Sequence, residues 1–408
     1  MPAEARPRQK VRTRQVFYIP GYDPVPPRRY RELYRTEGAE QARVSGYDIA
    51  VTKRAPGVRN FGWGVAANIE DTPTETQVEV LYWSDIVQKS MDRSIPSTYL
   101  LLARTAWEYI ATGALGRLMK LRIGPILAAL YPVAMLLAQL LAAILVGVLF
   151  AWMLSTWVHP WAGAPVGLGS AAGLLWWFRG KDGKLFAYYL MHDYGYSARF
   201  RGQNPPELEA RMAEFTARIA RAMDSDVDEV LVVGHSSGAH LAVSILADLI
   251  RSDHAWRPGA PQLSLLTLGQ VIPMVSFLRD AHRLRADLAY LGANRALCWV
   301  DVSAPGDGAT FALCDPVAVS GVAAPDHHQP LIVSAAFTQT LSDEKRAELG
   351  RRFFRLHFQY LCAFDRPGDY DYFRITAGPM TLAQRFAHRA HSPSRIAAPV
   401  NKFTRVTA

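Results

Sequence analysis

The stretch VLVVGHSSGAHL, residues 230–241, places two serines among glycines and histidines. It contains a match to the pattern G-x-S-x-G, formed by Gly234, His235, Ser236, Ser237 and Gly238. The apolar run VLVV before the match predicts a strand, and AHLAVSILADLI after it predicts a helix. A serine on a sharp strand-to-helix turn is well placed to attack a carbonyl carbon. We therefore expect Ser236 to be a nucleophile; a serine that only caps a helix would fit the same pattern.

A serine nucleophile needs hydrogen-bond donors for the oxyanion that forms during its reaction. The backbone N–H of the residue after the nucleophile, here Ser237, is one expected donor. The second typically lies in the loop after an early strand. The apolar run Val16–Pro20 predicts such a strand, and Gly21 permits a tight turn behind it. We expect the backbone N–H of Tyr22 to be this donor, with an ordinary glycine-containing turn as the alternative.

The serine must also be activated by a histidine that an acid orients, and the expected chain order is serine, acid, histidine. Asp307 is the expected acid, because it follows the predicted strand Ala296–Val302 and lies between two glycines. The main rival is Asp280, after the preceding predicted strand. Asp301 lies inside a strand, where a structural role is expected, and Asp315 is a candidate turn residue.

The expected base is His357, which follows the last predicted strand, Leu331–Ala336. Its alternative role is that of a partly buried helix histidine. His327 and His328 precede that strand and would lie at its wrong end. The remaining C-terminal histidines, His388 and His391, lie in a basic segment.

These residues resemble the α/β-hydrolase superfamily, and the downstream half, about Glu229–Leu361, resembles the class 3 (fungal-type) lipases. TLGQ at 267–270 is similar to that family's turn after strand 6, and HFQY, which begins at His357, is similar to its His-x-x-Tyr. The resemblance implies Ser236 as nucleophile, Asp307 as acid and His357 as base. Those lipases are generally secreted, whereas a secretory signal is not expected in this chain. Lipid substrates are implied by the resemblance alone.

A block without Asp, Glu, Lys or Arg runs from Ile123 to Phe178. These 56 residues exceed the roughly 20 that one membrane span requires. We expect two spans, about 126–154 and 161–178, with Pro132 as a candidate kink in the first. The turn between them is expected at HPWAGAP, residues 159–165, which is rich in Pro and Gly. A buried hairpin or a hydrophobic lid of a soluble enzyme is the alternative.

Basic residues flank the block on both sides and predict its orientation. They are Arg117, Lys120 and Arg122 before it and Arg179, Lys181 and Lys184 after it. A hairpin returns the chain to the side that it left, and the positive-inside rule makes that side cytoplasmic. We therefore expect a multi-pass membrane protein with its catalytic domain in the cytoplasm and a phospholipid membrane as its partner.

Short β-branched strands alternate with helices on both sides of the block, which predicts an α/β fold with a mostly parallel sheet. With the resemblance, the expected fold is an α/β-hydrolase fold interrupted by a transmembrane helical hairpin. The expected organisation is a basic N-terminal arm at 1–14, a hydrolase domain at 15–98 and 185–372, a membrane-associated insertion at 99–184, and a basic C-terminal tail at 373–408. The tail is expected to contact an anionic leaflet or simply to be solvated.

The composition limits the other classes of function. The net charge of +9 favours anionic partners. The basic residues gather at the chain ends and beside the spans without an aromatic-basic platform, so nucleic acid is not an expected partner. The three cysteines form no CxxC pair, and no metal and no cofactor are expected. The oligomeric state is left open.

The expected activity is that of a membrane-anchored serine hydrolase that cleaves a carboxylic ester, with a lipid-derived ester as the favoured substrate. An acyltransferase or thioesterase would use the same three residues and is the first alternative. A non-catalytic membrane scaffold with a degenerate hydrolase domain is the second.

Overall fold

The computed structural model describes residues 10–54, 60–157, 159–252, 259–350 and 352–407. A mixed eight-stranded sheet forms its centre, in the order β2-β3-β4-β1-β5-β6-β7-β8. The pairs from β4 through β1 and β5 to β8 are parallel, and β2–β3 and β3–β4 are antiparallel. The strands are β1 Thr13–Ile19, β2 Asp48–Thr52, β3 Gly62–Ile69, β4 Thr72–Val80, β5 Glu229–His235, β6 Gln262–Leu268, β7 Leu297–Ser303 and β8 Leu331–Ser334.

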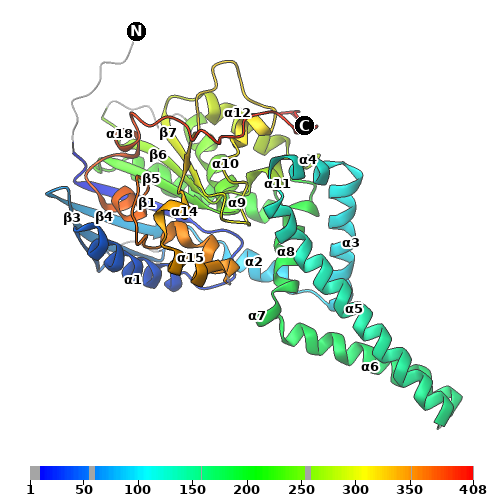
Figure 1. The fold of residues 1–408 in the computed structure, drawn as a ribbon. Helices are drawn as coiled ribbons and strands as arrows, with labels where there is room; N and C mark the ends of the chain where they lie inside the picture. The colour runs from blue at the N-terminus through cyan, green and yellow to red at the C-terminus, as the bar shows by residue number, and fades with distance from the viewer. Residues whose placement is uncertain (1–9, 55–59, 158, 253–258, 351, 408) are drawn as a thin grey trace.

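Helices cover both faces of this sheet, because its central strands are apolar on both faces (Figure 1). In β5, Val230 and Val232 pack on one face, and Leu231 and Val233 pack on the other. The first face carries α2 Ser84–Met91, α9 Pro206–Met223, α10 Gly238–Arg251 and α12 His282–Ala293. The second carries α1 Arg28–Ser45, α15 Asp343–Gly350, α17 Tyr372–Ala377 and α18 Leu382–Arg385. Short helices complete the loops: α11 Ile272–Ser276, α13 Pro316–Val319, α14 Phe337–Thr340 and α16 Phe353–His357.

A buried ion pair joins the two halves of the sheet where β1 meets β5. The Nε of Arg14 lies 2.7 Å from an oxygen of Glu229, 215 residues later in the chain, and both side chains are fully buried. Arg14 also donates to the carbonyls of Gly378 and Met380, and Glu229 accepts from the Ser264 hydroxyl. All the charged atoms therefore have partners, as buried charges require.

Between β4 and β5 the chain leaves the sheet and forms a group of helices (Figure 1). They are α3 Ile95–Ala111, α4 Ala114–Leu121, α5 Gly124–Trp157, α6 Pro160–Gly180, α7 Asp182–Leu185 and α8 Ala187–Ala198. Among the helices of the described residues, α5 alone is long and apolar enough to cross a membrane by length and composition. Leu136 on α5, Leu102 on α3 and Met191 on α8 share a small apolar core at its first half.

The second half of α5 projects away from the sheet with α6 beside it (Figure 1). The two helices approach closely at Gly147 and Gly167. A Cβ atom on Gly147 would lie 2.8 Å from the Gly167 carbonyl oxygen, and one on Gly167 would lie 2.6 Å from that of Gly147. Glycine is therefore required at this crossing, as in tightly packed apolar helix pairs.

The expected turn at residues 159–165 is wrong. His159 caps α6, and the helix begins at Pro160, so most of the Pro- and Gly-rich segment is helical. Proline is tolerated in the first turn of a helix, where its missing N–H has no helical partner. Gly113, which has φ 68°, separates α3 from α4.

Residues 373–386, placed in a basic tail by their charge, belong to the folded core. Phe373, Ile375 and Leu382 are buried against the sheet, and Arg14 bonds to the carbonyls between α17 and α18. Farther on, Ile396 forms a bridge with Cys314. Apolar residues spaced among the arginines hold this segment in place. The N-terminal arm lies mostly outside the described residues, and its end, Thr13 and Arg14, starts β1.

Candidate active site

Ser236 occupies the turn between β5 and α10. β5 ends at His235, α10 begins at Gly238, and Ser236 has φ 56°. This left-handed backbone is costly for any residue with a Cβ, and residues held in it concentrate at functional sites. The turn is held by a hydrogen bond of 2.9 Å from the Ser236 N–H to the carbonyl of Leu268 at the end of β6. Ser237 caps α10 without a side-chain bond to its backbone.

Three glycines allow the backbone segments around Ser236 to meet. A Cβ on Gly238 would lie 2.6 Å from the Pro20 carbonyl oxygen and closer still to that of Ile19. One on Gly234 would lie 2.8 Å from the Cα of Ala239, and one on Gly21 would lie 3.3 Å from the Ser236 Oγ. The loop after β1 therefore lies directly against the serine turn, and any side chain at these positions would separate them.

Asp307 and His357 are paired, as the sequence predicts. The Nδ1 of His357 lies 2.7 Å from an Oδ of Asp307. Asp307 follows β7, and His357 is the last residue of α16. The Asp307 carboxylate also accepts from the Tyr360 hydroxyl at 3.0 Å and from the Ala309 N–H at 2.9 Å. Such a pair fixes the orientation of the imidazole and leaves its Nε2 free to take a proton.

Electrostatics support charge separation within this pair. Burial alone would raise the pKa of Asp307, but the charge of His357 and the hydrogen bonds to the carboxylate lower it. Burial alone would lower the pKa of His357, but the charge and hydrogen bond of Asp307, with a contribution from Asp193, raise it. The histidine is thus a stronger base than an unpaired imidazole in the same place.

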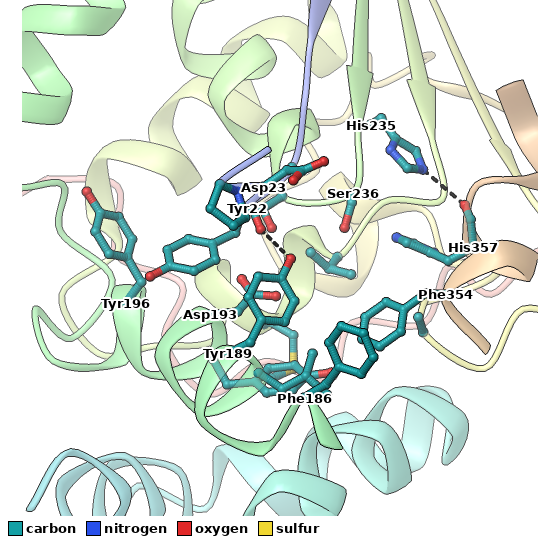
Figure 2. A pocket seen from close by; sticks show the side chains of 18 of the residues that line it. Tyr22, Asp23, Phe186, Tyr189, Asp193, Tyr196, His235, Ser236, Phe354 and His357 are labelled. Carbon is teal, nitrogen blue, oxygen red and sulfur yellow. Dashed lines mark hydrogen bonds between the residues drawn. The ribbon is translucent and has the colours of Figure 1, made fainter. Parts of the chain in front are cut away.

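Ser236 and His357 line one cavity (Figure 2). The His357 ring and the Ser236 hydroxyl face each other in this view, with the ring nitrogen on the side of the serine. Asp307 lies behind the histidine, bound to its other nitrogen. The structure therefore brings together the three residues that the chain order predicts.

His235 bonds to the backbone of His357, the expected base. The local sequence does not predict this contact. The Nε2 of His235 lies 3.1 Å from the carbonyl oxygen of His357, and its Nδ1 lies 3.3 Å from the Tyr18 hydroxyl. Burial lowers the pKa of His235 to about 3, so the ring is neutral and can donate only one of these bonds. Figure 2 shows the bond to His357.

The two expected oxyanion donors lie at the cavity. Tyr22 and Ser237 both line it, and Gly21 is adjacent to the Ser236 side chain. Within the described part of the chain, neither the Tyr22 N–H nor the Ser237 N–H donates a hydrogen bond. The Tyr22 carbonyl accepts from the Tyr189 hydroxyl at 2.6 Å, which fixes this loop. Both N–H groups are therefore available to a ligand.

The rival acids have other partners. Asp301 accepts from the Thr267 hydroxyl at 2.6 Å inside the sheet. Asp315 caps α13 and binds Arg395, and Asp280 faces Arg201. None of the three bonds to His357 in the described structure.

The cavity measures about 510 Å³, within the range of small-molecule sites. Its walls are largely aromatic and aliphatic, and α7 and α8 contribute one side of it. Phe186, between these helices, packs against Phe354 on α16 with ring centroids 4.7 Å apart. Tyr189 packs against Phe354 at 6.2 Å. Phe186 and the start of α8 thus close the cavity beside α16, the helix that carries His357.

No protein-family model, no curated protein and no solved structure matches the chain. Among the described residues, no group of three or more His, Cys, Asp or Glu side chains is arranged to hold a metal ion.

The close approach at Gly238 predicts the effect of one methyl group. We expect Gly238→Ala to push α10 away from the loop after β1 and to lower the rate of Ser236 acylation by at least about tenfold, as misplaced catalytic groups do. Gly183→Ala is the matched control, because a Cβ there meets nothing within 4 Å although Gly183 lines the same cavity. The rate at which an active-site-directed organophosphorus probe phosphonylates Ser236, a reaction that needs the same activated hydroxyl, measures the effect. Equal rates in the two variants would contradict the stated role of Gly238.

The raised pKa of His357 predicts the acid limb of the pH profile. Acylation requires neutral His357, so its rate falls as pH drops through this pKa. We expect the midpoint above pH 6.5, the ordinary histidine value, because the pKa of His357 is raised. His235 does not contribute between pH 5 and 9, since its pKa lies at about 3. The rate at which the probe phosphonylates Ser236, measured across this range in the native chain and in Asp193→Asn, gives the midpoint without the titration of Asp193, whose pKa is about 7. A profile without a fall down to pH 5 would exclude His357 as the base.

Proposed function

We propose that this chain is a membrane-anchored serine hydrolase with an α/β-hydrolase fold, resembling class 3 lipases, that cleaves a carboxylic ester. The observation that carries the proposal is the left-handed Ser236, held in one cavity with a histidine whose far nitrogen binds a buried carboxylate. Serine, acid and histidine follow the carboxyl ends of parallel strands in the order expected for such enzymes.

In the proposed reaction, the Ser236 Oγ attacks the ester carbonyl while the Nε2 of His357 takes the hydroxyl proton. The oxyanion receives hydrogen bonds from the backbone N–H groups of Tyr22 and Ser237, and the loss of one such donor typically costs about 100- to 1000-fold in rate. His357 then gives its proton to the leaving alkoxide. Asp307 stays ionised and stabilises the imidazolium.

The second half of the reaction releases the acyl group. A water molecule loses a proton to His357 and attacks the acyl-enzyme carbonyl, and the returning proton frees Ser236. The products are a carboxylic acid and an alcohol, and the chain is unchanged.

The position of the cavity supports a lipid-derived ester. Its lining includes Asp182, Gly183 and Phe186, which directly follow α6 in the chain. Its walls are mainly apolar, as an acyl chain requires. A substrate that resides in a membrane would therefore meet the cavity at the base of the helix pair.

The surface of α5 and α6 supports a membrane anchor of two spans. Large apolar side chains are exposed along both helices, whereas water-facing surfaces rarely collect them in contiguous patches. The strongest cases are Leu145, Val148, Trp157, Trp161, Leu168 and Trp176. The 21 residues of α6 span about 31 Å, close to the roughly 30 Å of a bilayer core. The basic residues that flank the two helices in the sequence favour a cytoplasmic location for the catalytic domain.

The nucleophile is tested with a fluorophosphonate probe on membranes that contain the chain. We expect labelling of the native chain and its complete loss in Ser236→Ala. Ser237→Ala keeps its backbone N–H and should label at a rate close to that of the native chain. Gel fluorescence measures the labelled fraction. Equal labelling of all three chains, or none in a folded native chain, would refute the proposal.

The two-span topology is tested with single cysteines at the tip and the base of the helix pair. In a chain whose three native cysteines are replaced by alanine, we expect His159→Cys to react with an impermeant maleimide added outside intact cells. Lys184→Cys should react only after the cells are opened. Both positions are exposed, so access alone decides the result. If His159→Cys reacts only in opened cells, the helix pair does not cross the membrane. Fluorophosphonate labelling confirms that each variant is folded.

A further inference from the structure

Three carboxyl side chains line the cavity besides the triad: Asp23, Asp182 and Asp193. Asp23 accepts from the Tyr30 hydroxyl at 2.6 Å and the Val25 N–H at 2.9 Å. Asp182 accepts from the N–H groups of Tyr188 and Tyr189 at the start of α8. Both carboxylates therefore hold the walls of the cavity together.

Asp193 differs from these two. Its carboxyl group accepts no hydrogen bond and forms no ion pair with any residue that the structure describes. It lies on α8, one turn after Tyr189, so both side chains share the face that forms the cavity wall. In Figure 2 the carboxyl group of Asp193 points into the cavity, on the opposite side of Ser236 from His357.

Tyrosines surround this carboxyl group but do not satisfy it. The charge of Asp193, after the larger effect of burial, contributes to raising the pKa of the hydroxyls of Tyr22, Tyr109 and Tyr189. All three hydroxyls are bonded elsewhere: that of Tyr22 to Ser90, that of Tyr109 to the Met274 carbonyl, and that of Tyr189 to the Tyr22 carbonyl. None of these three hydroxyls therefore donates to Asp193.

We propose that Asp193 is a specificity residue, which binds a hydrogen-bond-donating group of the ester substrate, a hydroxyl or an amine, close to the reacting carbonyl. The proposal rests on the hydrolase function proposed above. A polar group in an apolar cavity is unfavourable without a partner, and a substrate donor would supply the partner that the protein withholds. An ester without such a group would leave the carboxyl unpaired and would be disfavoured.

The electrostatic state of Asp193 agrees with this role. Burial raises the pKa of Asp193 to about 7, against the smaller lowering effect of His357. Near neutral pH the carboxyl can therefore accept from a hydroxyl in either protonation state, whereas an ammonium group would favour its charged form. The two donors are distinguished by experiment.

The test compares four esters of similar size with the purified full chain in detergent. Propyl decanoate has no donor; hydroxyethyl decanoate has a hydroxyl in the alcohol portion; propyl hydroxydecanoate has it in the acyl portion; dimethylaminoethyl decanoate has an amine. For the native chain we expect kcat/KM to be roughly 10- to 100-fold higher for at least one donor ester than for propyl decanoate, the range of a hydrogen bond to a charged group.

Asp193→Leu should abolish this preference, so that within this variant kcat/KM for each donor ester is close to that for propyl decanoate. Asp193→Asn should keep a hydroxyl preference in part and lose an amine preference, which identifies the donor. Ser197→Ala is the matched control, because it removes a polar group one turn farther along the same wall. It should leave the preference unchanged.

The assignment is overturned if the native chain shows no preference, if Asp193→Leu retains it, or if Ser197→Ala removes it instead. Fluorophosphonate labelling of Ser236 shows that each variant is folded. If Asp193→Leu is not labelled, the isosteric Asp193→Asn is used in its place. Its kcat/KM for the amine and hydroxyl esters then decides the test. A native chain that cleaves esters without preference refutes only the role of Asp193. One that cleaves no ester and does not label refutes the hydrolase proposal itself.

Discussion

The parallel pairing of β1 with β5 is the interaction on which the rest of the structure depends. Each strand belongs to a different half of the sheet, and the helices α3 to α8 separate them in the chain. The register of this pairing is fixed by the buried Arg14–Glu229 ion pair, because in any other register both buried charges would lack a partner. It also imposes a condition on the intervening helices, since the chain must return to the sheet that it left. The helices α5 and α6, which lie side by side, satisfy this condition.

The same pairing assembles the candidate site. β1 delivers Gly21 and Tyr22 to the turn at Ser236, while β7 and the segment after β8 deliver Asp307 and His357. On this side of the cavity, backbone contacts hold the segments around Ser236 together. The opposite wall is α8, which follows the apolar helix pair after the short helix α7 and carries the unpaired carboxyl group of Asp193. In the function proposed above, the sheet therefore supports the nucleophile, and the inserted helices support the wall that would bind the substrate.

Much of this arrangement could be predicted from the sequence, because local patterns specify it. The strand before Ser236 and the helix after it follow from apolar runs. The Asp307–His357 pair follows from chain order alone. Other features depend on contacts between distant segments. The bond from His235 to the His357 carbonyl has no local signal, and neither does the cavity wall on α8, whose aromatic residues show no simple periodicity. The prediction of a loop at the start of α6 is wrong, because proline and glycine are common in loops and proline is also common in the first turn of a helix.

The separation of β1 from β5 also has a consequence for biosynthesis. Strands β1 to β4 emerge from the ribosome first, and in their four-stranded sheet β1 is an edge. Val16, Phe17, Tyr18 and Ile19 on that edge are all buried in the finished fold. Their partner is synthesised about 215 residues later, which takes roughly 10 to 40 s at typical translation rates. Throughout this interval β1 is an apolar edge strand without a partner, the kind of surface that templates aggregation. The nascent chain therefore exposes this edge for a long interval before β5 can cover it.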